Sequence, residues 1–150
     1  MIKFTHKDID FKLTHQKDLK LWIANVISSH SLSVGDIVYL FTNDDEVLQV
    51  NKEFLGHDYY TDIITFDTSD YFDKKSINNK ISADIVISID TVKANALEYN
   101  ASFEEELYRV IIHGILHLIG FDDHSEEDIS QMREQENLAL NSLRDIIGDF

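Results

Sequence analysis

Residues 113–124 read His113-Gly114-Ile115-Leu116-His117-Leu118-Ile119-Gly120-Phe121-Asp122-Asp123-His124. His113 and His117 are four residues apart in an apolar run, so on a helix their side chains share one face. Gly120 can end that helix and turn the chain back, and His124 follows at a spacing from which it can close on the other two. Neutral imidazoles with one position left for water form a typical catalytic zinc site. The stretch therefore predicts one Zn²⁺ ion held by His113, His117 and His124.

Composition limits the setting in which this site works. The chain has 150 residues and no cysteine, so we expect a single domain over 1–150 without disulfides or thiolate metal ligands. The polar N-terminus and the absence of a long apolar run predict a cytoplasmic protein with no membrane contact. A net charge of −15 argues against sequence-independent binding of DNA or RNA. A bound dication can outweigh that charge locally.

The apolar pattern predicts an α+β fold, a small mixed sheet of about four strands covered by about five helices, with the zinc site at the end of a helix. Thr14 is the expected cap of the first helix, and Ser125 to Asp128 resemble a capping box that opens the last one. The polar stretch 68–80 is expected to be a mobile surface loop. The expected strands are 2–5, 36–42, 61–66 and 83–89, and the expected helices are 15–30, 43–56, 91–99, 103–119 and one beginning at 125.

The histidine pair has a plainer interpretation, as two core side chains bonded to backbone carbonyls. A metal is favoured because two buried imidazoles without partners carry a desolvation cost in an apolar helix. Gly114 stands where the H-E-x-x-H zinc proteases hold their general base, so peptidase activity is disfavoured. Glycine inside a helix costs up to about 1 kcal/mol, which indicates a close approach of backbone or substrate at this position.

Four segments resemble the YbeY family, bacterial endoribonucleases needed for ribosomal RNA maturation. Residues 113–124 are similar to its H-G-x-L-H-L-x-G-Y-D-H signature, and residues 51–66 to its N-x-x-[YF] and T-D-V-L-S-F motifs. Residues 83–88 resemble its G-D-I-x-I-S strand, and residues 132–136 its M-x-x-x-E motif. The resemblance covers about 90 residues in the family's order.

The resemblance implies a zinc-dependent, single-strand-specific endoribonuclease. Its implied roles are ribosomal RNA processing, including 3′-end maturation of the small-subunit RNA, and ribosome quality control. The implied partners are single-stranded or ribosomal RNA, the ribosomal subunit and assembly proteins, with no DNA and no membrane. Zinc would polarise a phosphoryl oxygen and lower the pKa of bound water towards ~7. The attacking group stays open between that hydroxide and the ribose 2′-hydroxyl.

Two departures from the family pattern bear on the site. The family's third histidine comes ten residues after the first, where this chain has Asp123, and His124 falls at eleven. Zinc also accepts carboxylate oxygen, so we favour His124 and keep Asp123 as the alternative. Leu55 stands where the family usually carries an arginine facing the groove. A guanidinium could hold a phosphate there, and the candidates to replace it are Lys52, His57 and Arg109.

Other side chains have weaker signals. Asp62 and Asp84 are either strand-end carboxylates or hydrogen-bond partners of a ligating histidine. Tyr59, Tyr60 and Phe121 can stack on bases, although simple packing explains them as well. Two other functions remain open, a non-cleaving ribosome assembly factor with a structural metal and a zinc hydrolase of another class, such as a peptidase.

Overall fold

The computed structural model describes residues 1–69 and 79–150. Within these residues it has four strands and five helices, which confirms the predicted α+β class. The strands are β1 (Ile2–His6), β2 (Ser33–Thr42), β3 (Ile63–Asp67) and β4 (Lys80–Ser88). The helices are α1 (Gln16–Ser29), α2 (Asp44–Leu55), α3 (Ile89–Glu98), α4 (Phe103–Ile119) and α5 (Glu126–Ile147).

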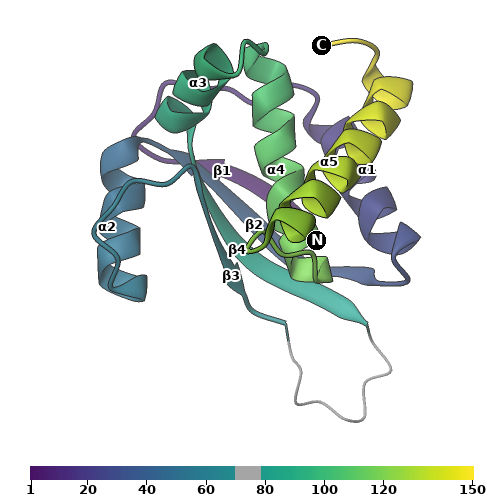
Figure 1. The fold of residues 1–150 in the computed structure, drawn as a ribbon, viewed down its shortest axis with the longest axis horizontal. Helices are drawn as coiled ribbons and strands as arrows, with labels where there is room; N and C mark the ends of the chain where they lie inside the picture. Colours follow the sequence, from purple (N-terminus) through teal and green to yellow (C-terminus); the bar gives the residue numbers. More distant parts are fainter. Residues whose placement is uncertain (70–78) are drawn as a thin grey trace.

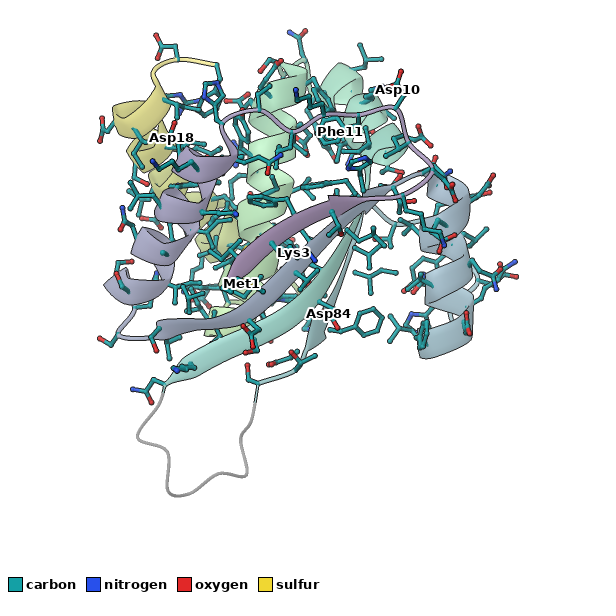
Figure 2. All side chains as sticks on the ribbon, turned by 180° about the vertical axis from the view of Figure 1, so that it is seen from behind. Met1, Lys3, Asp10, Phe11, Asp18 and Asp84 are labelled. Carbon is teal, nitrogen blue, oxygen red and sulfur yellow. The ribbon has the colours of Figure 1, made fainter. Side chains whose placement is uncertain are left out.

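The strands form one mixed sheet in the order β1-β2-β4-β3. β1, β2 and β4 pair in parallel, whereas β3 runs antiparallel to β4 and is an edge strand. Helices α1, α4 and α5 cover one face of the sheet, and α2 lies beside the end of β3 and β4 (Figure 1). Figure 2 shows the opposite face, with Lys3 and Asp84 on the side away from α4 and α5.

The main core lies between the sheet and the covering helices, because β2 and β4 are nearly continuous apolar runs that need cover. Two buried polar bonds fix how the layers meet. The Tyr39 hydroxyl on β2 donates to the carbonyl of Ile111 on α4 at 3.0 Å, and the Trp22 indole on α1 donates to the carbonyl of Ala139 on α5 at 2.8 Å. These bonds set α4, the helix with the two histidines, across the sheet.

Local predictions had mixed outcomes. The capping box is present, since Ser125 accepts from the backbone of Asp128 and the Asp128 side chain accepts from the backbone of Ser125. The Thr14 cap is wrong: His15 occupies the cap position in a left-handed conformation, and the cap has no side-chain hydrogen bond. Strand β2 begins at Ser33, earlier than predicted, because its first residues pair with β4. Most of the expected loop 68–80 lies outside the described residues.

Candidate metal centre

Helix α4 carries both histidines of the predicted site. Ser102 caps the first turn of α4 by accepting a hydrogen bond from the backbone N–H of Glu105. The acidic side chains in that turn are stabilised by the positive end of the helix dipole. The helix ends as predicted at Gly120, whose φ of 124° is unfavourable for other residues. This glycine lets the chain turn back, so that the residues after it return to the end of α4.

Gly114 marks a close approach of α4 to the sheet. A Cβ atom there would lie 3.0 Å from the Ile63 side chain and 3.2 Å from the Thr65 hydroxyl, both on β3. The missing side chain therefore lets α4 pack against β3, which brings the edge strand beside the histidines. A close approach is present as predicted, but the neighbours are side chains of the sheet and not the expected backbone or substrate.

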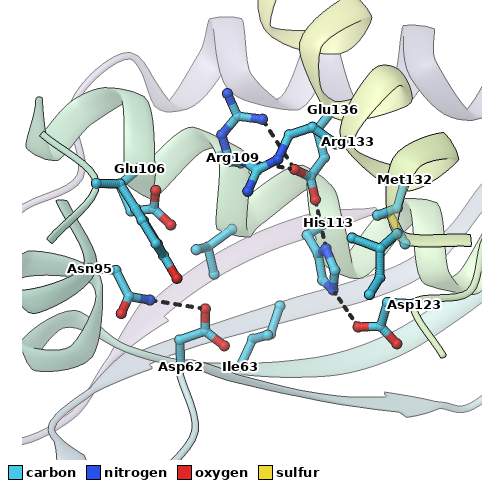
Figure 3. A pocket seen from close by; sticks show the side chains of 13 residues that line it. Asp62, Ile63, Asn95, Glu106, Arg109, His113, Asp123, Met132, Arg133 and Glu136 are labelled. Carbon is cyan, nitrogen blue, oxygen red and sulfur yellow. Dashed lines mark hydrogen bonds and ion pairs between the residues drawn. The ribbon is translucent and has the colours of Figure 1, made fainter. Parts of the chain in front are cut away.

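His113 is held by a buried carboxylate. Its Nδ1 lies 2.7 Å from Oε2 of Glu136 on α5. A carboxylate accepts, so Nδ1 donates and the neutral ring keeps its lone pair on Nε2. Burial opposes protonation of this imidazole, but the hydrogen bond and charge of Glu136 outweigh burial and raise the pKa of His113. Nε2 points to the opposite side, toward Asp123 (Figure 3).

His117 is oriented by the turn after Gly120. Its Nδ1 lies 2.8 Å from the carbonyl oxygen of Phe121, which can only accept, so the free lone pair is again on Nε2. The His113 and His117 rings have centroids 5.7 Å apart. Both rings thus have one nitrogen hydrogen-bonded to an acceptor and the other free, the arrangement usual for ligating histidines.

The third donor comes from the turn. Asp123 Oδ2 lies 3.7 Å from His113 Nε2, and donor atoms of His117, Asp122 and Asp123 lie within 4.8 Å of one another. In the described part of the chain these three form the one such group. The side chain of His124 is 82% exposed, and its Nε2 lies 3.4 Å from Asp122 Oδ1. The turn therefore brings Asp123, rather than His124, to the two helical histidines.

Glu136 is the functional residue whose role the sequence did not reveal. Its side chain is buried, and besides His113 it accepts from Arg109 at 3.1 Å and pairs with Arg133 at 3.6 Å. Burial would raise its pKa, but the hydrogen bond from His113 and the two arginines hold the pKa below its usual value. The signal was present as a glutamate in the buried stripe of α5, within the M-x-x-x-E motif.

Asp62 and Asp84 do not bond to the histidines. The Asp62 carboxylate accepts from Asn95 Nδ2 at 3.4 Å and faces His113 across a cavity (Figure 3). Burial raises the pKa of this carboxyl, and the charge of His113 offsets part of the effect. Asp84 is exposed on the other face of the sheet (Figure 2). The carboxylate that hydrogen-bonds to His113 is therefore Glu136, and not one of these two aspartates.

Two cavities meet at this centre, and Asp62, Ile63, His113 and Asp123 line both. The first, of about 260 Å³, extends between α3, α4 and α5 and is also lined by Glu106. The second, of about 310 Å³, extends toward α2. A linear substrate can therefore cross the centre from one cavity to the other.

A sequence profile of the family described as endoribonuclease YbeY matches residues 1–144. The chain belongs to this family. It is 44% identical to endoribonuclease YbeY of Porphyromonas gingivalis over 98% of this chain and 93% of the relative. It is 45% identical to endoribonuclease YbeY of Azobacteroides pseudotrichonymphae over 95% of this chain and 98% of the relative.

The fold agrees with this membership. The solution structure of a Thermotoga maritima protein superposes with a TM-score of 0.60 at 25% identity, covering 97% of this chain and 93% of that one. The YbeY relatives are named endoribonucleases, hydrolases that cut RNA. Among the residues that the structure describes, every helix is too short or too polar to span a bilayer.

The structure also places the candidates for the YbeY arginine missing at Leu55. Leu55 and His57 line the second cavity together with His117. His57 stacks on Tyr59 with centroids 5.1 Å apart, while Lys52 pairs with Asp58 at 3.2 Å. Arg109 lines the first cavity. The second cavity, which Leu55 lines, therefore offers the imidazole of His57 and no guanidinium. The guanidinium groups of Arg109 and Arg133 line the first cavity, on the other side of the centre.

The other aromatic candidates are placed as follows. Tyr59 and Tyr60 are more than half exposed, whereas Phe121 packs edge-on against His30. Tyr59 is held in position because its carbonyl accepts from the buried Asn51 side chain at 2.9 Å. Of the three, Tyr59 is the one that lines the site.

Proposed function

We propose that residues 1–150 act as one metal-dependent hydrolase domain that cuts single-stranded RNA, with ribosomal RNA precursor as its substrate in the cell. The observation that carries this proposal is the pair of oriented imidazoles beside a carboxylate, at the junction of two cavities, in a member of the YbeY family. The ribosomal subunit and its assembly proteins are the proposed partners, and the cytoplasm is the proposed location.

The donor types fit a single zinc ion: His117 lies within 4.8 Å of Asp122 and Asp123, and His113 lies outside that group and would close on it when the ion binds. His113 and His117 would bind it through Nε2, since each Nδ1 is engaged by an acceptor. We propose Asp123 as the third donor because its carboxylate lies beside His113 Nε2, and zinc accepts carboxylate oxygen. His124, the ligand predicted from the sequence, is the alternative. When bound, zinc supplies a Lewis acid for the phosphoryl oxygen and a water of lowered pKa.

The chain's own groups orient the reaction. Glu136 fixes the His113 ring and its tautomer, and the hydrogen bond from His113, together with Arg109 and Arg133, lowers the pKa of Glu136 and keeps it ionised. Arg133 is 55% exposed at the rim of the first cavity, so its guanidinium can meet a substrate phosphate. The two cavities hold the strand on both sides of the scissile bond, which favours an extended, unpaired substrate.

The activity is tested with an unstructured oligonucleotide derived from ribosomal RNA. We expect the wild type to cleave it, chelation to stop cleavage, added Zn²⁺ to restore it, and His117→Ala to abolish it. Equal cleavage by wild type and His117→Ala would indicate a contaminating nuclease. No cleavage by a wild type that binds zinc stoichiometrically would favour the assembly factor, and digestion of unfolded protein would favour a peptidase.

The third donor is tested by comparing Asp123→Ala with His124→Ala in a zinc competition assay. Loss of one ligand should weaken binding strongly in the first variant and leave the second close to wild type. The reverse order would restore His124 as the ligand.

A further inference from the structure

The first cavity ends at a buried acid that the metal centre does not use. Glu106 is 6% exposed as a whole residue and lines the cavity. Among the described residues no protein group donates a hydrogen bond to its carboxylate, and no fully buried side-chain oxygen lacks a partner, so these oxygens open onto the cavity. A carboxylate that opens only onto such a cavity is partly shielded from water, which costs free energy. Burial accordingly raises the pKa of Glu106, with Arg109 offsetting part of the effect. A ligand that donates hydrogen bonds would remove this cost.

Glu106 and His113 belong to the same face of α4. They are seven residues apart, which places them two turns, or roughly 10 Å, apart along the helix axis. Figure 3 shows Glu106 with Asn95 at one end of the cavity and His113 with Asp123 at the other. A group bound at Glu106 would therefore be a close neighbour of the reacting phosphate along the same strand.

The remaining walls suit a flat ring with a polar edge. Val110 and Ile129 supply apolar surface, and Tyr99, 58% exposed, supplies an aromatic ring at the rim. The Asn95 amide adds a donor and an acceptor next to the acid. Bases of single-stranded RNA are bound in this way, stacked on aromatic rings and hydrogen-bonded along their Watson–Crick edges.

A second metal ion fits this end of the cavity less well. A divalent ion needs several oxygen donors close together. Among the residues described, Asp62, Glu106 and Glu136 do not form a group whose donor atoms lie within 4.8 Å of one another. The cavity also has apolar walls, which suit a base better than a hydrated ion.

We propose that the Glu106 end of this cavity is a nucleobase subsite that selects guanine next to the scissile bond, an inference that rests on the proposed RNA cleavage. Guanine is the base whose Watson–Crick edge offers two adjacent N–H donors, N1–H and the N2 amine, to one carboxylate. Adenine and cytosine offer a single amine beside an acceptor nitrogen that would face the carboxylate. Uracil offers one N–H between two carbonyls.

The test is to sequence the ends of fragments cut from a single-stranded RNA of random sequence. We expect wild type to enrich guanine at one position beside the cut by roughly 10-fold, in line with a bidentate base contact. Glu106→Gln should abolish the enrichment while still cutting at other bases. Glu104→Gln, an exposed glutamate on the same helix, should retain it and is the matched control.

A second measurement changes the substrate instead of the cavity. Oligonucleotides with guanosine at that position are compared with matched ones carrying inosine, which lacks the N2 amine. We expect inosine to reduce kcat/KM several-fold in wild type and to have no effect in Glu106→Gln. Cleavage by wild type with no base preference, or the same preference in Glu106→Gln, would overturn the subsite and leave the nuclease intact. Absence of metal-dependent cleavage would overturn both proposals.

Discussion

Replacing Glu136 by glutamine should weaken zinc binding without disrupting the fold. Glutamine keeps the shape of the side chain but removes the charge that the His113 N–H meets at 2.7 Å. Loss of such a partner of a ligating histidine usually lowers metal affinity about 10- to 100-fold. That factor corresponds to about 1.4–2.8 kcal/mol of binding free energy.

The assay is competition for Zn²⁺ against a chromophoric chelator of known affinity. Glu134→Gln, an exposed glutamate on the same helix, is the control and should bind as wild type does. Far-ultraviolet circular dichroism of both metal-free variants checks that the fold is intact.

The loss should depend on pH. In the metal-free wild type Glu136 raises the pKa of His113, so a proton competes with the metal at low pH. In Glu136→Gln the pKa of His113 is lower, so protons compete less with Zn²⁺. The loss of zinc affinity relative to wild type should therefore be smaller at pH 6 than at pH 8. An unchanged affinity in Glu136→Gln at pH 8, with the fold intact, would refute the role assigned to this carboxylate.

Three further predictions concern stability. Tyr39→Phe removes the buried bond to the Ile111 carbonyl and should lower the free energy of unfolding by about 1 kcal/mol, measured by urea denaturation. Gly114→Val places methyl groups against β3 and should cost about 1–3 kcal/mol, and wild-type stability in this variant would contradict the packing described. The metal-free protein should be more stable at pH 6 than at pH 8, because the raised pKa of His113 contributes stability that is lost as pH rises through the folded value. In Glu136→Gln that difference in urea midpoint should shrink, and a persistent difference would assign the effect to another group.

Features that depend on near neighbours could be predicted from the sequence. The spacing of His113 and His117 places them on one helix face because helix geometry is set by four consecutive residues. The Gly120 turn and the capping box at Ser125 rest on equally local backbone chemistry. The α+β class followed from apolar periodicity.

Tertiary structure decided which side chains meet. Glu136 lies 23 residues from His113, and they meet because α5 packs on α4. Whether Asp123 or His124 lies beside His113 depends on how the turn after Gly120 folds back. The two residues are adjacent in the sequence, so spacing alone could not decide between them. The place of Glu106 in a cavity is visible only in the folded chain, where α3 and α5 also line that cavity. In the sequence it is one more glutamate in an acidic first turn, which the helix dipole explains. Sequence alone thus located the two helical imidazoles, and long-range packing set the carboxylates around them.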